Sequence, residues 1–94
     1  MTNINLENFI NTAAAEMIAS VDYAVEHKDD DRNFNWFDWA TDRIDDSYQN
    51  VLGVLIYLHN YIDQTISNDE YDRLTKQNRE ARLKARELAA EKLI

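Results

Sequence analysis

Residues 5–27, with the sequence NLENFINTAAAEMIASVDYAVEH, decide the fold class of this 94-residue chain. Apolar residues recur there every three or four positions, a spacing that gathers side chains on one face of an α-helix. The stretch contains no glycine or proline to interrupt the pattern. It therefore predicts an amphipathic helix, and its apolar stripe consists of Leu6, Phe9, Ile10, Ala13, Met17, Val21 and Ala24.

The rest of the chain supports the same all-α prediction. With one glycine and no proline, the chain has too few turn-forming residues for the turns of a β-sheet. Apolar spacing predicts a helix over about residues 35–45 and another over about 48–64, where Ile62 ends the stripe. The polar break at residues 45–47 between them is weak, so one continuous or kinked helix is the alternative. The apolar-free run at 28–33 predicts a loop.

A last helix is predicted from Asn68 to the C-terminus. Ser67 and Glu70 have the spacing of a capping box, which satisfies exposed backbone amides at a helix start. Apolar positions are sparse beyond this start, so we expect the first half to pack on the body and the second half to project or to pair with another chain. The expected fold is one domain over residues 1–94, a bundle of three to four helices with a long, partly projecting C-terminal helix.

Charge divides the chain into an acidic body and a basic end. Residues 1–72 hold fifteen of the eighteen carboxylates and only three basic side chains, a net charge of −12. Residues 73–94 hold seven basic side chains and three glutamates, a net charge of +4. In terms of predicted elements, the acidic body covers 1–66 and the basic helix 67–94. Such a division is typical of a protein that presents charge to a macromolecular partner.

Composition excludes several classes of function. The chain has no cysteine, so it offers no disulfide or thiolate chemistry, and a reducing cytoplasm is the expected location. No apolar run approaches the roughly 20 residues needed to span a bilayer. A net charge of −8 disfavours direct binding to nucleic acid or to an anionic membrane. The expected partner is a basic surface.

Residues suited to catalysis or metal binding are few. His27 and His59 lack the local spacing of a zinc motif, and a helix end and a core edge are their expected places. The run Asp29-Asp30-Asp31 lacks the alternating ligands, the turn glycine and the distal glutamate of a calcium loop. We therefore predict no enzymatic activity, no metal and no cofactor.

Two sets of carboxylates are spaced to gather on one side of a helix. Like charges four residues apart cost about 0.2–0.5 kcal/mol each, so the sequence either uses their field or tolerates it for solubility. Carboxylates four apart lie about 6 Å apart along the axis, and could imitate part of a phosphate array. The two sets are Asp22, Glu26, Asp29 and Asp30, and Asp38, Asp42, Asp45 and Asp46.

The aromatic residues near the second set are the other candidate contact. Trp36, Phe37, Trp39 and Phe34 cannot all enter so small a core, because they point in different directions around a helix. Core packing and exposure remain open for Trp36 and Trp39. An exposed tryptophan would be an interface candidate.

Residues 39–52, WATDRIDDSYQNVL, form an acidic helical stretch that runs into a tyrosine and a Val-Leu pair. With the small size, the acidity and the absence of cysteine, this stretch resembles the phage-encoded DNA-mimic anti-restriction proteins, and the chain also resembles small anti-CRISPR proteins. The resemblance implies a non-enzymatic inhibitor that occupies the DNA groove of a defence complex. The basic last helix is a departure from that pattern.

The basic helix gives the alternative function. Its glutamates and its lack of aromatic residues disfavour nucleic-acid binding, so we expect it to pack on acidic surface, its own or that of a second copy. In the second case the chain would be a self-associating structural or regulatory module, a homodimer held through Leu74, Ala81, Ala85 and Leu88.

Overall fold

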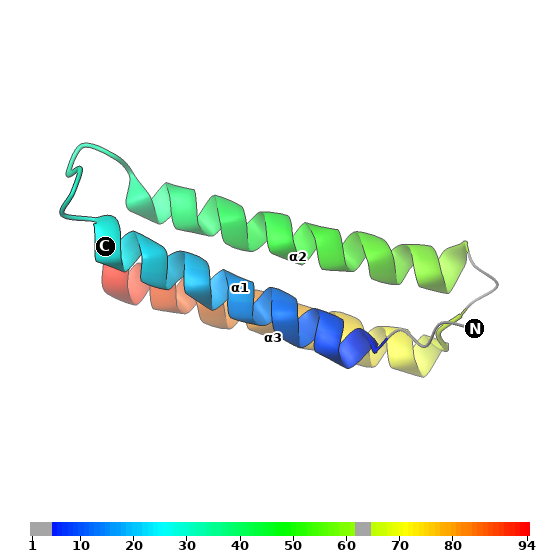
Figure 1. The fold of residues 1–94 in the computed structure, drawn as a ribbon. Coiled ribbons are helices and arrows are strands. Elements are labelled where there is room, and N and C mark those ends of the chain that lie inside the picture. The colour runs from blue at the N-terminus through cyan, green and yellow to red at the C-terminus, as the bar shows by residue number, and fades with distance from the viewer. Residues whose placement is uncertain (1–4, 62–64) are drawn as a thin grey trace.

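Three helices lie side by side along the long axis of the molecule, and the second runs antiparallel to the first and the third (Figure 1). The computed structural model describes residues 5–61 and 65–94. Within these ranges the helices are α1 (Leu6–His27), α2 (Trp36–Asn60) and α3 (Asn68–Leu93), and there is no strand. Each helix packs against the other two, and the bundle measures 49 × 22 × 18 Å. The all-α prediction is confirmed, with three helices in the described part of the chain.

Helix α1 has the expected bounds and the expected core stripe. Asn5 caps its start, since the side-chain oxygen accepts a hydrogen bond from the backbone N–H of Asn8 at 3.0 Å. The predicted stripe is buried except at Phe9, which is 37% exposed. Phe9 thus lies outside the core, and the predicted stripe was too wide by this one residue.

Helix α2 runs without interruption through the polar residues 45–47, so the prediction of two separate helices is wrong and the continuous alternative is right. Ile44 and Tyr48 pack in the same core cluster on either side of this segment. Their packing outweighs the weak preference of Asp and Ser for non-helical backbone. The helix ends at Asn60, short of the predicted residue 64, and Ile62 lies outside the described residues.

The loop between α1 and α2 lies where the apolar-free run predicted it (Figure 1). The side chain of Asp31 accepts a hydrogen bond from the backbone N–H of Asn33 at 3.0 Å, and its carbonyl accepts one from the Trp36 indole at 3.2 Å. Asn35 then caps α2 by accepting from the backbone N–H of Asp38. Local hydrogen bonds therefore fix how the chain enters α2.

Helix α3 begins at the predicted cap, where the Ser67 hydroxyl accepts a hydrogen bond from the backbone N–H of Glu70 at 3.1 Å. Its second half packs on the bundle and does not project. Ala85 and Ala89 are fully buried, and Leu88 and Leu93 pack against the same core cluster. Small side chains allow close approach of the helices, so a sparse apolar pattern is sufficient to bury this half.

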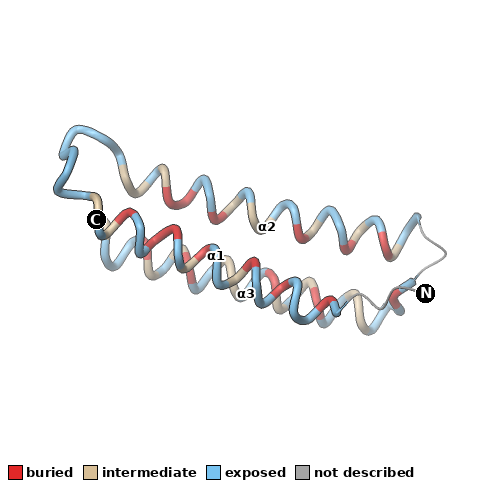
Figure 2. Tube along the Cα trace, viewed as in Figure 1, coloured by how far each residue is buried: buried red, intermediate tan, exposed pale blue. Residues whose placement is uncertain are grey.

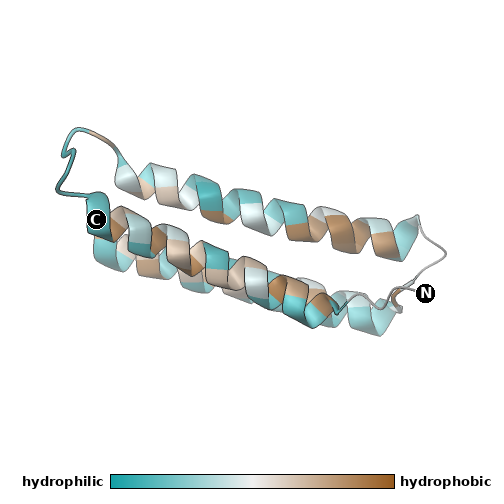
Figure 3. Ribbon diagram, viewed as in Figure 1, coloured by the Kyte–Doolittle hydropathy of each residue, from teal (hydrophilic) through white to brown (hydrophobic). Residues whose placement is uncertain are grey.

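The core consists of two hydrophobic clusters, one toward each end of the bundle. Buried residues face inward along all three helices (Figure 2), and the brown apolar bands of Figure 3 follow the same faces. On α3, Leu74 belongs to the first cluster and Ala85 to the second. Asn78 lies between them, 1% exposed. Its amide donates to the carbonyl of Tyr48 at 3.1 Å, whereas its own oxygen has no partner.

Candidate functional site

One carboxylate of the second acidic set, Asp45, is held by the basic helix. Arg82 Nε lies 2.9 Å from Asp45 Oδ1, and Arg86 Nη1 lies 3.0 Å from Asp45 Oδ2. The Arg82 guanidinium also lies over the ring of Tyr48, 4.8 Å from its centroid. The expectation that the basic helix packs on the chain's own acidic surface is confirmed here. Asp45 is therefore occupied within the fold, although the sequence placed it among the partner-binding residues.

The same contacts set the ionisation of Asp45. Burial by itself raises the pKa of this carboxyl, but the hydrogen bonds from Arg82 and Arg86 and their positive charges lower it by more. The pKa of Asp45 consequently lies below its ordinary value, and the carboxylate stays charged in the folded protein.

A second interhelical pair joins Arg73 Nη1 of α3 to Glu7 Oε1 of α1 at 2.9 Å, on the surface.

The remaining predicted carboxylates are exposed to solvent. Asp30 contacts the His27 ring at 2.8 Å, and Asp38 accepts a hydrogen bond from the Asn35 amide at 2.9 Å. The others make no ion pair among the described residues. The exposed members of the two sets are Asp22, Glu26, Asp29, Asp30, Asp38, Asp42 and Asp46.

The structure does not merge the two sets into one array. Ser20 lies on the α2 side of α1, where it lines a hollow between the two helices. Asp22 is rotated about 200° from Ser20, so it lies on the side of α1 that faces away from α2. The α2 row of Asp38, Asp42 and Asp46 is therefore a surface of its own, with carboxylates about 6 Å apart along the axis.

The residues predicted for self-association lie inside the bundle. Leu74 and Ala85 are fully buried, and Ala81 and Leu88 pack against the second core cluster. These side chains cover α1 and α2 of the same chain. A dimer through this seam would have to open the bundle, so the packing does not favour the self-associating alternative.

Both tryptophans are half-buried and belong to a cluster of rings at the loop end of α1 and α2. The ring of Trp39 lies 5.2 Å from that of Tyr23 and 5.6 Å from that of Trp36, centroid to centroid. The Arg43 guanidinium lies over Trp39, 5.0 Å from its centroid. Phe34, at 44% exposed, is the most open of the predicted aromatic group.

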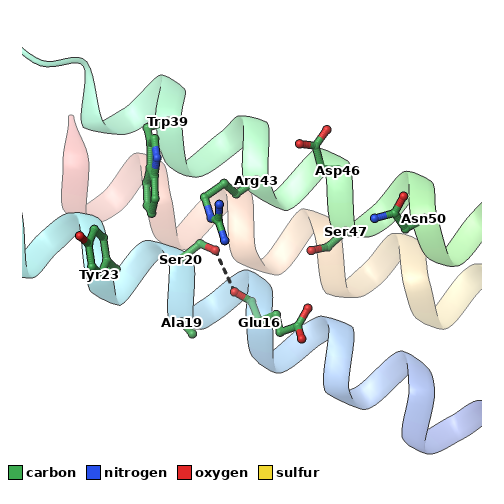
Figure 4. A pocket seen from close by; sticks show the side chains of 9 residues that line it. All are labelled: Glu16, Ala19, Ser20, Tyr23, Trp39, Arg43, Asp46, Ser47 and Asn50. Atoms are coloured by element: carbon green, nitrogen blue, oxygen red, sulfur yellow. Dashed lines mark hydrogen bonds between the residues drawn. The ribbon is translucent and has the colours of Figure 1, made fainter.

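Beside this cluster, α1 and α2 enclose an open hollow of about 700 Å³, which we call the α1–α2 groove (Figure 4). Trp39 and Arg43 extend from α2 toward α1 in this view, and Tyr23 rises from α1 (Figure 4). No residue of α3 lines it. The lining residues are Glu16, Ala19, Ser20, Tyr23, Trp39, Arg43, Asp46, Ser47 and Asn50.

The sequence prediction missed this groove, although a signal for it was present. Treating residues 35–64 as two short helices hid a second stripe on α2 that continues past the polar segment. Trp39, Arg43, Asn50 and Tyr57 follow one another at spacings of four, seven and seven, so they share one face of a long helix. The stripe becomes visible only when α2 is read as a single helix.

The two histidines make structural contacts. The His27 ring contacts that of Tyr23 in a tilted arrangement, with ring centroids 4.2 Å apart, at the C-terminal end of α1. His59 stacks on Tyr71 at 4.3 Å and its Nε2 lies 2.6 Å from the Asn68 side-chain oxygen, which ties the end of α2 to the start of α3. Residues 5–61 and 65–94 contain no group of three or more side chains placed to hold a metal ion.

Comparison with protein-family models, with curated proteins and with solved structures gives no match to this chain. In the part of the chain that the structure describes, no helix has both the length and the apolar character for a membrane crossing.

Proposed function

We propose that this chain is a non-enzymatic protein that binds a basic, nucleic-acid-binding surface of a partner protein. The observation that supports the proposal is the row Asp38, Asp42 and Asp46, whose carboxylates are exposed, whereas three arginines of α3 pair with Asp45 and Glu7. The basic helix neutralises Asp45 and Glu7 and leaves this row free. An exposed row of one sign attracts a surface of the opposite sign.

In its most specific form the proposal is inhibition of a DNA-binding defence complex, of the restriction or CRISPR type, in the cytoplasm of a host cell. The spacing of the row supports this form. Its carboxylates recur about every 6 Å, close to twice the 3.4 Å rise between phosphates of one DNA strand. A surface that binds the backbone of DNA would then bind this row in its place.

The test is an affinity capture from host-cell lysate at about 50 mM and at about 300 mM salt, because added salt screens exposed charge contacts. The bait is compared with a variant in which Asp38, Asp42 and Asp46 are changed to Asn. A matched control changes Glu80, Glu87 and Glu91 to Gln, which removes the same charge from exposed positions on α3.

The expected result is a nuclease, methyltransferase or CRISPR component that is recovered at low salt and released by duplex DNA. The Asn variant should lose it, and the α3 control should keep it. Recovery of no partner at either salt would contradict the proposal. Equal loss with both variants would also contradict it, because net charge alone would then account for the binding.

A further inference from the structure

Most of the large exposed apolar residues of the described chain lie on α1 and α2, the two helices that form the α1–α2 groove. Eight large hydrophobic side chains of the described residues are exposed; Leu83 lies on α3 and Ile94 directly follows it. Phe34 lies in the loop between α1 and α2, outside the groove. The other five are Phe9, Tyr23, Val54, Tyr57 and Tyr61. Apolar side chains of this size gathered on one face are typical of a surface that another molecule covers.

Helical spacing places these residues on two continuous stripes. On α1, Phe9 precedes Glu16 by seven residues, and Tyr23 follows Glu16 by seven. On α2, the stripe that contains Trp39 and Asn50 continues four and seven residues beyond Asn50, to Val54 and Tyr57. Residues at such spacings share a helix face. The groove is therefore one part of a longer seam between α1 and α2, with rings toward both ends and polar residues in the middle.

A seam between two antiparallel helices has the shape that receives another helix. Four-helix bundles are completed in this way, by a helix that lies in the groove between two others with its apolar stripe inward. The stripes on α1 and α2 supply the facing positions. Tyr23 and Trp39 would contact the incoming helix near the loop end, and Tyr57 near the other.

The charges of the groove define the chemistry of that helix. Glu16 and Asp46 line it, and its one basic lining residue, Arg43, has its guanidinium over the ring of Trp39. The positive charge of Arg43 is thus engaged by the ring within the chain, and the two carboxylates are the remaining charges of the groove. A second copy of this chain would bring a further net charge of −8, whereas Lys or Arg beside an apolar stripe would be attracted.

We propose that the α1–α2 groove is the docking site for an amphipathic helix of the partner, with an apolar stripe flanked by basic residues. The inference rests on the proposed function, because it takes the partner to be basic, and it adds the element of the partner that is bound. Aromatic side chains in a groove of this kind carry most of the binding energy of an interface.

The test uses two synthetic peptides of roughly 20 residues with the same leucines at helical spacing and no aromatic residues. One peptide carries Lys and Arg beside the stripe, and the other carries Glu. Trp36 and Trp39 are the two tryptophans of the chain, so intrinsic fluorescence reports on this end of the groove. The basic peptide should shift the emission and bind at least about tenfold more tightly than the acidic one.

The matched variants are Tyr23→Ala and Leu83→Ala, which truncate large side chains that are 47% and 53% exposed. Tyr23→Ala should weaken binding of the basic peptide at least about tenfold, and Leu83→Ala should leave it unchanged. Circular dichroism should show that both variants keep their helices. The two variants differ in that Tyr23 lines the groove and Leu83 lies on α3.

Three outcomes would overturn the inference. If Tyr23→Ala binds the basic peptide as tightly as the unchanged protein, the peptide sits on the exposed carboxylates; the groove then has no role, and the proposed function stands. If the acidic peptide binds as well as the basic one, charge does not select the occupant, and the proposed function fails with the inference. If sedimentation shows a homodimer that Tyr23→Ala dissociates, the occupant is a second copy.

Discussion

At the scale of single residues, Asp45 shows how a position in an acidic row can serve the fold. Its carboxylate receives Arg82 and Arg86 from α3, while Asp42 and Asp46 on the same helix stay exposed. The sequence alone does not distinguish the paired aspartate from the exposed ones, since each follows another at helical spacing. The distinction depends on which turn of α3 lies opposite, and spacing along α2 alone does not contain that information.

We expect Asp45→Asn to lower the free energy of unfolding by about 1 kcal/mol or less near neutral pH, because the pair is partly exposed to solvent. The pKa of Asp45 is lower in the folded protein than in the unfolded chain. Its contribution is therefore full above the unfolded value of about 3.9 and is lost as the pH falls through the folded pKa.

Urea unfolding of the unchanged protein and of Asp45→Asn, at about pH 7 and about pH 2.5, checks this prediction. The difference between them should be present at the higher pH and vanish at the lower. Asp46→Asn is the control, because Asp46 is exposed and makes no ion pair among the described residues. A difference that persists unchanged at the lower pH would show that Asp45 acts through something other than its charge.

Asn78 gives a second prediction for a single residue, because burial of its side chain lowers the free energy of unfolding. Its side-chain oxygen is buried without a partner, and burying such an atom costs about 1–3 kcal/mol. We expect Asn78→Leu to raise the free energy of unfolding by about 1 kcal/mol. Asn78→Ala removes the same polar atoms but leaves a cavity, so it should be less stable than Asn78→Leu in the same urea titration. A loss of stability in Asn78→Leu would contradict this account.

At the scale of elements, the helices were predictable where packing and local preference agree. The stripe from Leu6 to Ala24 and the Ser67 cap gave the correct bounds of α1 and the correct start of α3. In α2, local preference at residues 45–47 opposed the packing of Ile44 and Tyr48, and packing prevailed. The α1–α2 groove could not be predicted while α2 was divided, because its stripe crosses that segment.

Gly53 gives a prediction for α2 as an element. It is exposed within the helix, and a Cβ added there meets nothing within 4 Å. Gly53→Ala should raise the free energy of unfolding by about 0.5–1 kcal/mol, since alanine loses less backbone entropy in a helix. Ala15→Gly, the reverse change at an exposed position in α1, should lower it by a similar amount in thermal unfolding. Equal melting temperatures in all three proteins would contradict the prediction.

At the scale of the whole molecule, closure of the core depends on the second half of α3. Sparse apolar residues led to the expectation of a projecting helix, because the packing of alanine against facing helices cannot be recognised from its own sequence. Ala85 and Ala89 are nonetheless fully buried in the cluster that contains Met17, Val21 and Ile44. The acidic body and the basic helix thus share one core.

A pair of neighbouring substitutions tests this closure. Ala89→Glu places a carboxylate at a fully buried position, and Ala90→Glu places the same group at the next, exposed residue. We expect the first change to lower the free energy of unfolding by about 3 kcal/mol or more and the second by less than about 0.5 kcal/mol. Similar urea midpoints for the two variants would show that this half of α3 lies free of the bundle.

The alternating direction of α1, α2 and α3 has a mechanical consequence. Helix α1 begins at one end of the long axis and α3 finishes at the other (Figure 1), along a body that extends 49 Å. A cargo joined ahead of α1 and another joined behind α3 would be held apart by the length of this rod, whereas a two- or four-helix hairpin array would bring them together. Fluorophores at the two positions should accordingly report a wide, fixed separation, and the chain would serve as a rigid spacer in any fusion.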